Sequence, residues 1–327
     1  MYKLFRKFTD TGEKDKKFTV EMSAIAMNIV LGVMAAFTDS SFLSGSNFIN
    51  ILDSVTLYLL LALGLTFVLL SGSVNLAVGG MLSLNCVLFA IFANRFGFWS
   101  IPMVIVCGFV QGLATGWIFN LFKIPSFIAT YGMMGIFTSL AVILSKGSPI
   151  VINMTVMRQL RALLQARYLP GVKTQYILTA VVFLIFLFIQ KRTAFGKHVV
   201  GVGNSPAAMR HMGTDIGRVK LLSYGLSGLS TAIGSIILCS RLFAGDPTVG
   251  ASYLLLIVAV VIVGGTSLTG GIGGIFNTLL GALTISVLQN VLQIMGVNIY
   301  YHSVVIGAVM IIAVAISLDK KRVLVVK

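Results

Sequence analysis

The sequence predicts an all-α protein, a polytopic bundle of membrane-spanning helices. Apolar residues make up 57% of the 327 residues and charged residues only 10%, whereas roughly a quarter of the residues are charged in ordinary soluble domains. Water is therefore not the solvent for most of the surface. Because lipid offers backbone groups no hydrogen-bond partners, long apolar runs must form helices. The period-2 alternation of a membrane β-barrel is missing.

About ten runs approach the length of ~20 apolar residues that a helix needs to cross a hydrocarbon core. We expect spans at 20–38, 51–71, 74–93, 99–121, 126–145, 174–190, 221–240, 253–265, 272–294 and 300–317. The run at 253–265 is short. The first run starts behind a charged tail, and no small-residue cleavage pattern follows it. We therefore expect it to remain as a helix and not to be removed as a signal peptide.

The distribution of Lys and Arg predicts the orientation, because basic loops are retained on the cytoplasmic side. Ten spans place both termini inside, and most of the 24 basic residues then fall in cytoplasmic segments. We expect an N-terminal tail at 1–19, a single transmembrane domain at 20–318 and a C-terminal tail at 319–327. Positive-inside retention and attraction to anionic lipid account for the net charge of +15, so the charge calls for no nucleic-acid partner.

The segment 146–173 is basic although this topology places it outside. Apolar residues recur in it at helical spacing, namely Val156, Met157, Leu160, Leu163 and Leu164. Arg158, Arg161 and Gln165 fall on the other side, so we expect an amphipathic helix on the outer membrane surface. It would either cover the bundle as a cap or form a docking surface for an external soluble protein.

The loop 190–220 is short, basic and rich in glycine, and it separates two long apolar stretches. A soluble partner could push on a polar segment of this kind. Within it, Ser205 fits an N-cap, Pro206 fits the first helical position and Gly213 fits a C-terminal stop. These signals predict a short helix at 206–211; a plain connecting loop is the alternative.

The chain carries no evident source of energy or of bond chemistry. None of the nine acidic residues lies in the interior of an expected span, which argues against proton coupling but leaves sodium sites made of carbonyls and hydroxyls open. The chain has no G-x-x-x-x-G-K-[ST] phosphate cradle, and the nearest glycine cluster, at 264–274, lacks the lysine. The three His and three Cys residues show no metal-ligand spacing. Energy must therefore come from outside the chain, and we expect no enzyme activity.

Two polar interruptions are candidate lining segments. The segment 70–80, LSGSVNLAVGG, breaks a hydrophobic run; broken helices in membranes line a cavity or pack within protein, and tight helix crossing at small residues is the alternative. In the segment 122–132, Pro125 fits a helix start, and Ser126, Thr130 and Tyr131 are possible lining groups. There the alternative is that hydroxyls bond the carbonyls of their own helix.

Five blocks of the sequence resemble the permease subunits of ribose-type and other monosaccharide importers, which are ATP-binding-cassette systems. The blocks are LGLTFVLLSGSVNLAVGG at 63–80, KIPSFIATYGMM at 123–134, TAFGKHVVGVGNSPAAMRHMGTDIGRVK at 193–220, SRLFAGDPTVG at 240–250 and VGGTSLTGGIGGIFNTLLGAL at 263–283. They occur in the family's order, and the resemblance covers roughly residues 45–315.

The resemblance implies an importer permease fold in the bacterial cytoplasmic (inner) membrane. The partners that it implies are two cytoplasmic ATPases, which bind ATP and Mg, a second permease subunit and an extracytoplasmic sugar-binding protein. It implies no cofactor on this chain. A short cytoplasmic helix of the permease would sit in a groove on the ATPase. The matching positions are Asn204, Ala207, Ala208 and Gly213, with Ser205 as the N-cap.

We expect a monosaccharide resembling ribose, xylose or galactose to be moved inward by alternating access. The candidate path residues are Ser71, Asn75, Phe127, Thr130 and Tyr253. The chain departs from the family at three positions where acids are expected and Asn75, Leu254 and Leu256 stand. One hypothesis is that the chain is the less polar half of a heterodimeric permease.

Other cargoes and one other class of transporter are alternatives. Related subunits serve nucleosides, the quorum-signal furanone of the autoinducer-2 type and branched-chain amino acids. An amino-acid cargo should require paired charges in the path, and the spans offer none. An ATP-independent facilitator or channel is the alternative of another class.

Overall fold

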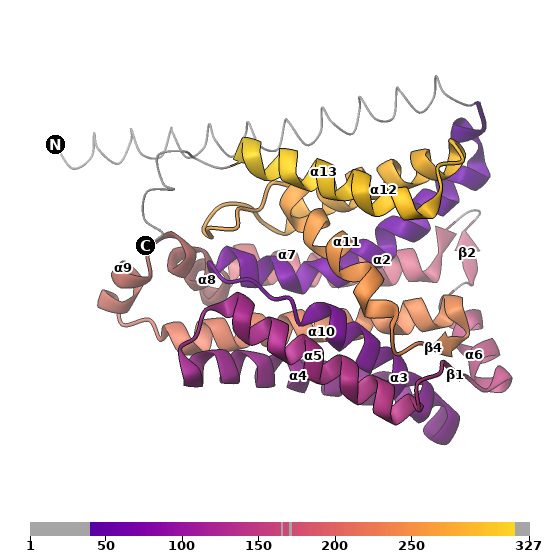
Figure 1. Cartoon of the computed structure of the whole chain (residues 1–327), viewed down its shortest axis with the longest axis horizontal. Coiled ribbons are helices and arrows are strands. Elements are labelled where there is room, and N and C mark those ends of the chain that lie inside the picture. The colour runs from indigo at the N-terminus through magenta and orange to yellow at the C-terminus, as the bar shows by residue number, and fades with distance from the viewer. Residues whose placement is uncertain (1–39, 165, 170–171, 318–327) are drawn as a thin grey trace.

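The computed structural model describes residues 40–164, 166–169 and 172–317 (Figure 1). The expected first span at 20–38 and the two expected tails, 1–19 and 319–327, lie outside the described residues. The predictions made for those three segments therefore stay predictions.

The described part is mostly helical, and each remaining expected span coincides with a helix. These helices are α2 (Gly45–Leu70), α3 (Val78–Phe96), α4 (Ser100–Phe122), α5 (Ser126–Ser145), α7 (Thr174–Arg192), α10 (Ile216–Leu242), α11 (Val249–Val263), α12 (Ile275–Ile294) and α13 (Ile299–Ser317). Six helical stretches are long and apolar enough to cross a membrane: α2, the stretch 78–122, α5, α7, α10 and α12. The polytopic helical class is thus confirmed, whereas α11, with 15 residues, is shorter than a standard span.

Short elements cluster at the two ends of the bundle. One end, which we call the α6 end, carries α6 (Met154–Leu164) and small strands (Figure 1). The α9 end, opposite, carries α8 (Ala194–Asn204) and α9 (Pro206–His211). The remaining short elements are η1 (Ser40–Leu43), η2 (Gly97–Trp99), β1 (Ile150–Val151), β2 (Arg167–Leu169), β3 (Val172–Lys173) and β4 (Ala244–Gly245). β1 pairs antiparallel with β4, and β2 with β3, so the expectation of a purely helical chain misses two small sheets.

Helix α2 is the central element. In its most apolar stretch 83% of the residues are buried, compared with 72% in α10, 67% in α12 and only 22% in α7. An apolar helix buried on all sides belongs to the core of the bundle. Helices α4, α5 and α7 instead expose apolar side chains, which suits contact with lipid or with another membrane helix.

Helices α4 and α10 pack through glycine. Gly108, Gly112 and Gly116 recur every four residues on α4, and a methyl group on Gly112 would lie 2.9 Å from the Cα atom of Gly225 on α10. Small residues at this spacing let two backbones approach closely, as in membrane-helix pairs generally. The contact fixes α10, the helix that follows α9, against the bundle.

The segment 190–220 is not the open loop that its charge suggested. Helix α7 runs to Arg192, α8 and α9 follow, and α10 begins at Ile216, five residues before its expected start. Asp215 explains the early start, because its side chain accepts a hydrogen bond of 3.1 Å from the amide nitrogen of Arg218 and so caps α10. Helix α11 likewise begins four residues earlier than expected, at Val249.

Candidate functional site

The predicted short helix α9 is confirmed with its predicted caps. Ser205 is the N-cap, and its Oγ accepts a hydrogen bond of 3.3 Å from the amide nitrogen of Ala208. Pro206 is the first residue, and Gly213 follows in the left-handed conformation with φ +78°. The local signals in the sequence therefore place the helix correctly.

Helix α9 is also accessible. The five residues expected to contact an ATPase, namely Asn204, Ser205, Ala207, Ala208 and Gly213, are all exposed. Met209 is the buried residue of α9, and its side chain lies against Gly201 of α8. A short exposed helix held by one apolar anchor is a surface on which a soluble partner can bind.

The break between α2 and α3, residues 71–77, is held by side chains of α5 and α10. The amide nitrogen of Val74 donates to Ser126 Oγ, and that of Leu76 donates to Thr130 Oγ1, each at 3.1 Å. The hydroxyl of Tyr224 donates to the carbonyl oxygen of Val74 at 3.0 Å. These bonds replace the missing helix ladder, which backbone at membrane depth requires.

Three of the five expected path residues meet at this break, but they face protein. Asn75 is fully buried, donates from Nδ2 to Ser227 Oγ at 3.1 Å and accepts at Oδ1 from the amide nitrogen of Ala77 at 3.0 Å. The Ser71 hydroxyl donates to the carbonyl oxygen of Val68 at 2.7 Å. In this structure Ser71, Asn75 and Thr130 stabilise the break.

The side chains of the other two expected path residues do not join them. Phe127 is 56% exposed on the outward side of α5, as is Tyr131 at 66%. Tyr253, on α11, is half-buried, and its ring centre lies 6.3 Å from that of Tyr58 on α2. The Tyr58 hydroxyl bonds the side chain of Gln289 on α12. The five residues therefore do not form one pocket in this structure.

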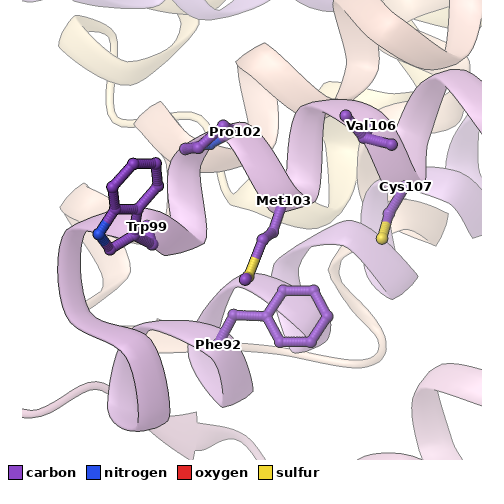
Figure 2. A pocket seen from close by; sticks show the side chains of 6 residues that line it. All are labelled: Phe92, Trp99, Pro102, Met103, Val106 and Cys107. Carbon is purple, nitrogen blue, oxygen red and sulfur yellow. The ribbon is translucent and has the colours of Figure 1, made fainter.

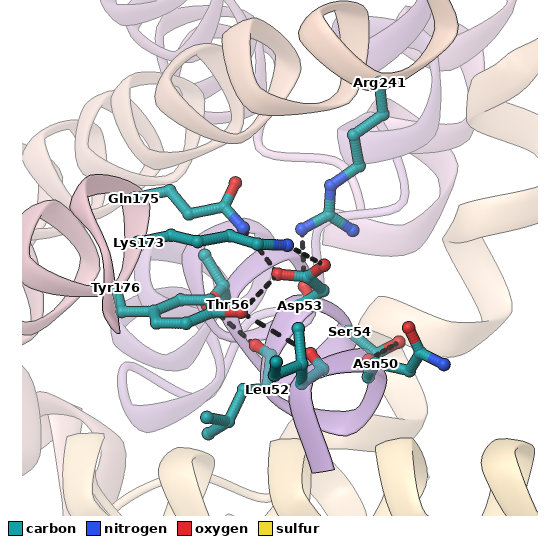
Figure 3. A network of polar contacts seen from close by, with 10 residues as sticks. Asn50, Leu52, Asp53, Ser54, Thr56, Lys173, Gln175, Tyr176 and Arg241 are labelled. Atoms are coloured by element: carbon teal, nitrogen blue, oxygen red, sulfur yellow. Dashed lines mark hydrogen bonds and ion pairs between the residues drawn. The ribbon is translucent and has the colours of Figure 1, made fainter. Parts of the chain in front are cut away.

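A polar network at the α6 end surrounds Asp53 of α2 (Figure 3). Its carboxylate accepts hydrogen bonds from Lys173 Nζ, Gln175 Nε2 and the Tyr176 hydroxyl, each at 2.6 Å. Arg241, in the last turn of α10, donates to the Asp53 carbonyl oxygen at 2.6 Å. One residue thus ties α2 to the start of α7 and to the end of α10.

The expected amphipathic helix is present as α6, whereas its place on the outer membrane surface stays a prediction. Met157, Leu160 and Leu164 are buried. The prediction that Leu163 lies on the same buried face is wrong, because its side chain is 44% exposed. Gln165 lies outside the described residues. Arg161 stacks on the ring of Phe243, 4.7 Å from its centre, and β1 pairs with β4, so the segment is fastened over the end of α10.

One pocket is far too apolar for a polar solute (Figure 2). It has a volume of about 450 Å³ and lies beside η2, on α3 and α4. Its lining is Phe92, Trp99, Pro102, Met103, Val106 and Cys107. A sugar placed there would lose water around its hydroxyls without gaining hydrogen-bond partners, so this pocket is not a candidate sugar site.

Sequence reasoning missed Tyr224 and Ser227, although a signal was present. Ser223, Ser227, Thr231 and Ser235 recur every four residues within an expected span, and all four are buried. That spacing marks one polar stripe on a membrane helix, which indicates a face packed against other polar groups.

Comparison with known proteins relates the chain to membrane permeases. The family described as "Branched-chain amino acid transport system / permease component" matches residues 47–314. The chain is 31% identical over 303 residues to "Ribose import permease protein RbsC" of Haemophilus influenzae, covering 91% of this chain and 93% of that protein. It is 35% identical to the protein of that name in Bacillus subtilis, over 90% of each chain. It is 28% identical to "Xylose transport system permease protein XylH" of Haemophilus influenzae, over 94% of this chain and 98% of that protein. No solved structure matches the chain.

Proposed function

Since the chain belongs to the family of branched-chain amino acid transport system permease components, we propose that it carries a monosaccharide across the membrane as the permease of an ATP-binding-cassette importer. It is a multi-pass protein of the bacterial inner membrane and not an enzyme, because ATP is hydrolysed by a separate subunit. The observation that carries the proposal is the extent of the match, which spans about nine-tenths of both this chain and its ribose-permease relatives.

The cargo proposed is a pentose or hexose resembling ribose, xylose or galactose. The relatives named for ribose and xylose support it. An amino-acid cargo carries two opposite charges, and in the described residues the acids are Asp53, Asp215 and Asp246, none at mid-span. Asp53 is already engaged by three donors. Uncharged walls that hold the cargo weakly suit a permease, because tight binding would slow its release.

We place the α9 end in the cytoplasm. The segment there is rich in basic residues, namely Lys191, Arg192, Lys197, Arg210, Arg218 and Lys220, as cytoplasmic loops are. With the expected span at 20–38, the topology then has ten spans with both termini inside. The α6 end faces outward, where a sugar-binding protein would dock on the cap made by α6 and the small strands.

Helix α9 is the proposed contact with the ATPase. Asn204, Ser205, Ala207, Ala208 and Gly213 would lie at the groove of that subunit. The exposure of α9 and its single buried anchor, Met209, support this role. ATP and Mg would be bound by the ATPase, and this chain would carry no cofactor.

The outward face of α5 is the proposed contact with a second permease subunit. Gly132 and Gly135 lie on it, and a methyl group on either would meet nothing within 4 Å. Small exposed residues on a membrane helix allow close approach of another helix. Phe127 and Tyr131 share this face, so the sugar would pass between the two subunits. Ser71, Asn75 and Thr130 would reach it when the break rearranges during alternating access.

Transport by purified components tests the proposal. Vesicles would contain this chain, its partner permease and the ATPase, with the sugar-binding protein outside and labelled ribose, xylose or galactose as cargo. We expect uptake that requires both ATP and the binding protein. Equilibration of sugar in vesicles that lack the ATPase would instead show a facilitator. Uptake of leucine, a nucleoside or a furanone in place of all three sugars would contradict the cargo.

A further inference from the structure

Three chain segments meet at the α9 end, and around Gly203 and Gly270 they meet through backbone atoms. They are the end of α2 at 70–72, the end of α8 at 203–204 and the loop between α11 and α12 at 270–271. The amide nitrogen of Gly271 donates to the carbonyl oxygen of Leu70 at 2.9 Å. We call these three segments the backbone junction.

The backbone junction leaves no room for a side chain at Gly203 or at Gly270. A methyl group on Gly203 would overlap the carbonyl oxygen of Leu70 and the amide nitrogen of Gly271. A methyl group on Gly270 would lie 2.7 Å from the Cα atom of Gly72. Gly72, Gly270 and Gly271 also have φ values of +71°, +88° and +75°, a region that favours glycine.

One side of the junction is continuous with α9. Asn204 ends α8, Ser205 caps α9 and Pro206 begins it, so a single residue separates the two helices. The side chain of Asn204 occupies the place that a methyl group on Gly271 would need. A displacement of α9 must therefore move the end of α8 and press on the loop at 270–271.

The other side of the junction is the break between α2 and α3. Leu70 ends α2 and Gly72 lies in the break, which is also hydrogen-bonded to α5 and α10. The loop at 264–274 is fixed separately, because Gln190 Oε1 at the end of α7 accepts from the amide nitrogen of Ile275 at 2.8 Å. The junction thus connects α8 and α9 to the broken helix within a fixed frame.

We propose that the backbone junction is the mechanical link through which α9 moves the break between α2 and α3. The inference rests on the proposed function, in which an ATPase displaces α9. Side chains in contact can change rotamer and absorb a displacement, whereas backbones in direct contact pass it on, as close-packed interiors transmit strain. Gly203 is the key positioning residue, because it lets α8 touch both α2 and the loop.

The test uses the complete importer with the single substitution Gly203→Ala. We expect the ATPase to remain bound and to hydrolyse ATP, while sugar uptake per ATP falls about tenfold, because the added methyl group separates α8 from α2. Gly307→Ala is the matched control, since a methyl group at that position of α13 meets nothing within 4 Å. Uptake per ATP equal to that of the control would overturn the proposal.

A second pair of variants decides the matter if Gly203→Ala does not reach the membrane. Gly270 and Gly296 both have positive φ, +88° and +68°, but a methyl group on Gly270 would lie 2.7 Å from the Cα atom of Gly72, whereas one on Gly296 meets nothing within 4 Å. The two alanine substitutions therefore both strain the backbone, but only Gly270→Ala also forces the junction apart. We expect only Gly270→Ala to lower uptake per ATP, and equal values in both would overturn the proposal.

A third variant separates this proposal from the proposed function. Ala208→Glu changes the exposed surface of α9 itself. If it transports normally, the proposed contact between α9 and the ATPase is wrong. If it fails to transport while Gly203→Ala and Gly270→Ala match their controls, the proposed function stands and the junction proposal alone is wrong.

Discussion

Thr130 stabilises the break between α2 and α3 from a neighbouring helix. Its Oγ1 accepts the hydrogen bond from the Leu76 amide nitrogen, in a fully buried position. We expect Thr130→Val to keep the shape of the side chain but to leave that N–H group unpaired, which costs about 1–3 kcal/mol. Thermal unfolding in detergent would show a lower midpoint for this variant than for the wild type.

Thr138→Val is the control for that measurement. Thr138 lies on the same helix and is half-buried, so the substitution has the same chemistry away from the break. Equal unfolding midpoints for the two variants would contradict the role assigned to Thr130.

We predict that Asp53→Asn loosens the structure around β3 and the start of α7. Asp53→Asn turns one acceptor oxygen into an NH₂ donor that faces other donors, so the three bonds from Lys173, Gln175 and Tyr176 cannot all remain. Hydrogen bonds to a charged group contribute about 1.5–3 kcal/mol each. We expect faster hydrogen exchange in β3 and at the start of α7.

Asp246→Asn is the control for that measurement. The Asp246 carboxylate accepts hydrogen bonds only from nearby Thr248, in an exposed turn. The same exchange rates in both variants would refute the prediction.

Residue polarity alone predicted which side chains matter at the break, but not where they point. Asn75 and Thr130 stand out in sequence because they are polar in apolar runs. Whether such a group faces a path or its own protein depends on partners such as Ser227, 152 residues away. Long-range pairing of that kind leaves no local signal.

At the scale of elements, local signals predicted α9 well because its caps lie within the segment itself. The strands β1 and β4 could not be predicted in this way. Each has two residues, too few for any periodicity, and their pairing joins Ile150 to Gly245 across the chain. The start of α10 was missed because its cap, Asp215, lies before the apolar run from which the span was inferred.

Helix α9 yields a prediction about coupling. We expect Ala208→Glu to insert into the membrane normally but to separate ATP hydrolysis from sugar uptake, because a long charged side chain would prevent seating in the ATPase groove. Uptake and ATP hydrolysis should be measured together in vesicles. Ala194→Glu is the matched control, since Ala194 is an exposed alanine at the same end and an acidic residue is favourable in the first turn of α8. Coupled transport at the control's rate in the Ala208 variant would contradict the assignment.

At the scale of the molecule, composition and run length predicted the helical bundle, because the bilayer limits the choice of structure. They did not predict which helices are central. Helices α2 and α7 are both apolar, with mean hydropathies of 2.0 and 1.7, yet α2 is the core and α7 is peripheral. Their difference comes from packing partners such as Gly64 of α2, whose amide nitrogen bonds Ser230 of α10 at 2.9 Å.

The whole molecule also bears on whether the permease is a homodimer. Asn75 is buried, and Leu254 and Leu256 are half-buried on α11, where the resemblance led us to expect acids. Carboxylates are strong acceptors for the hydroxyls of a sugar, so two copies of this chain would give a path poor in such acceptors. We predict that a second, more acidic permease supplies them.

Purification with and without that second permease tests the prediction. We expect the chain expressed alone to give monomers or unstable dimers in detergent, measured by light scattering, and no ATP-driven uptake in vesicles. Coexpression should give a one-to-one complex that transports, because the contact on α5 would then join unlike faces. The matched comparison is the chain with Leu254→Asp and Leu256→Asp, expressed alone. Gain of uptake in that variant would support missing acids as the cause, whereas a stable homodimer of the unaltered chain that transports sugar would rule out the heterodimer.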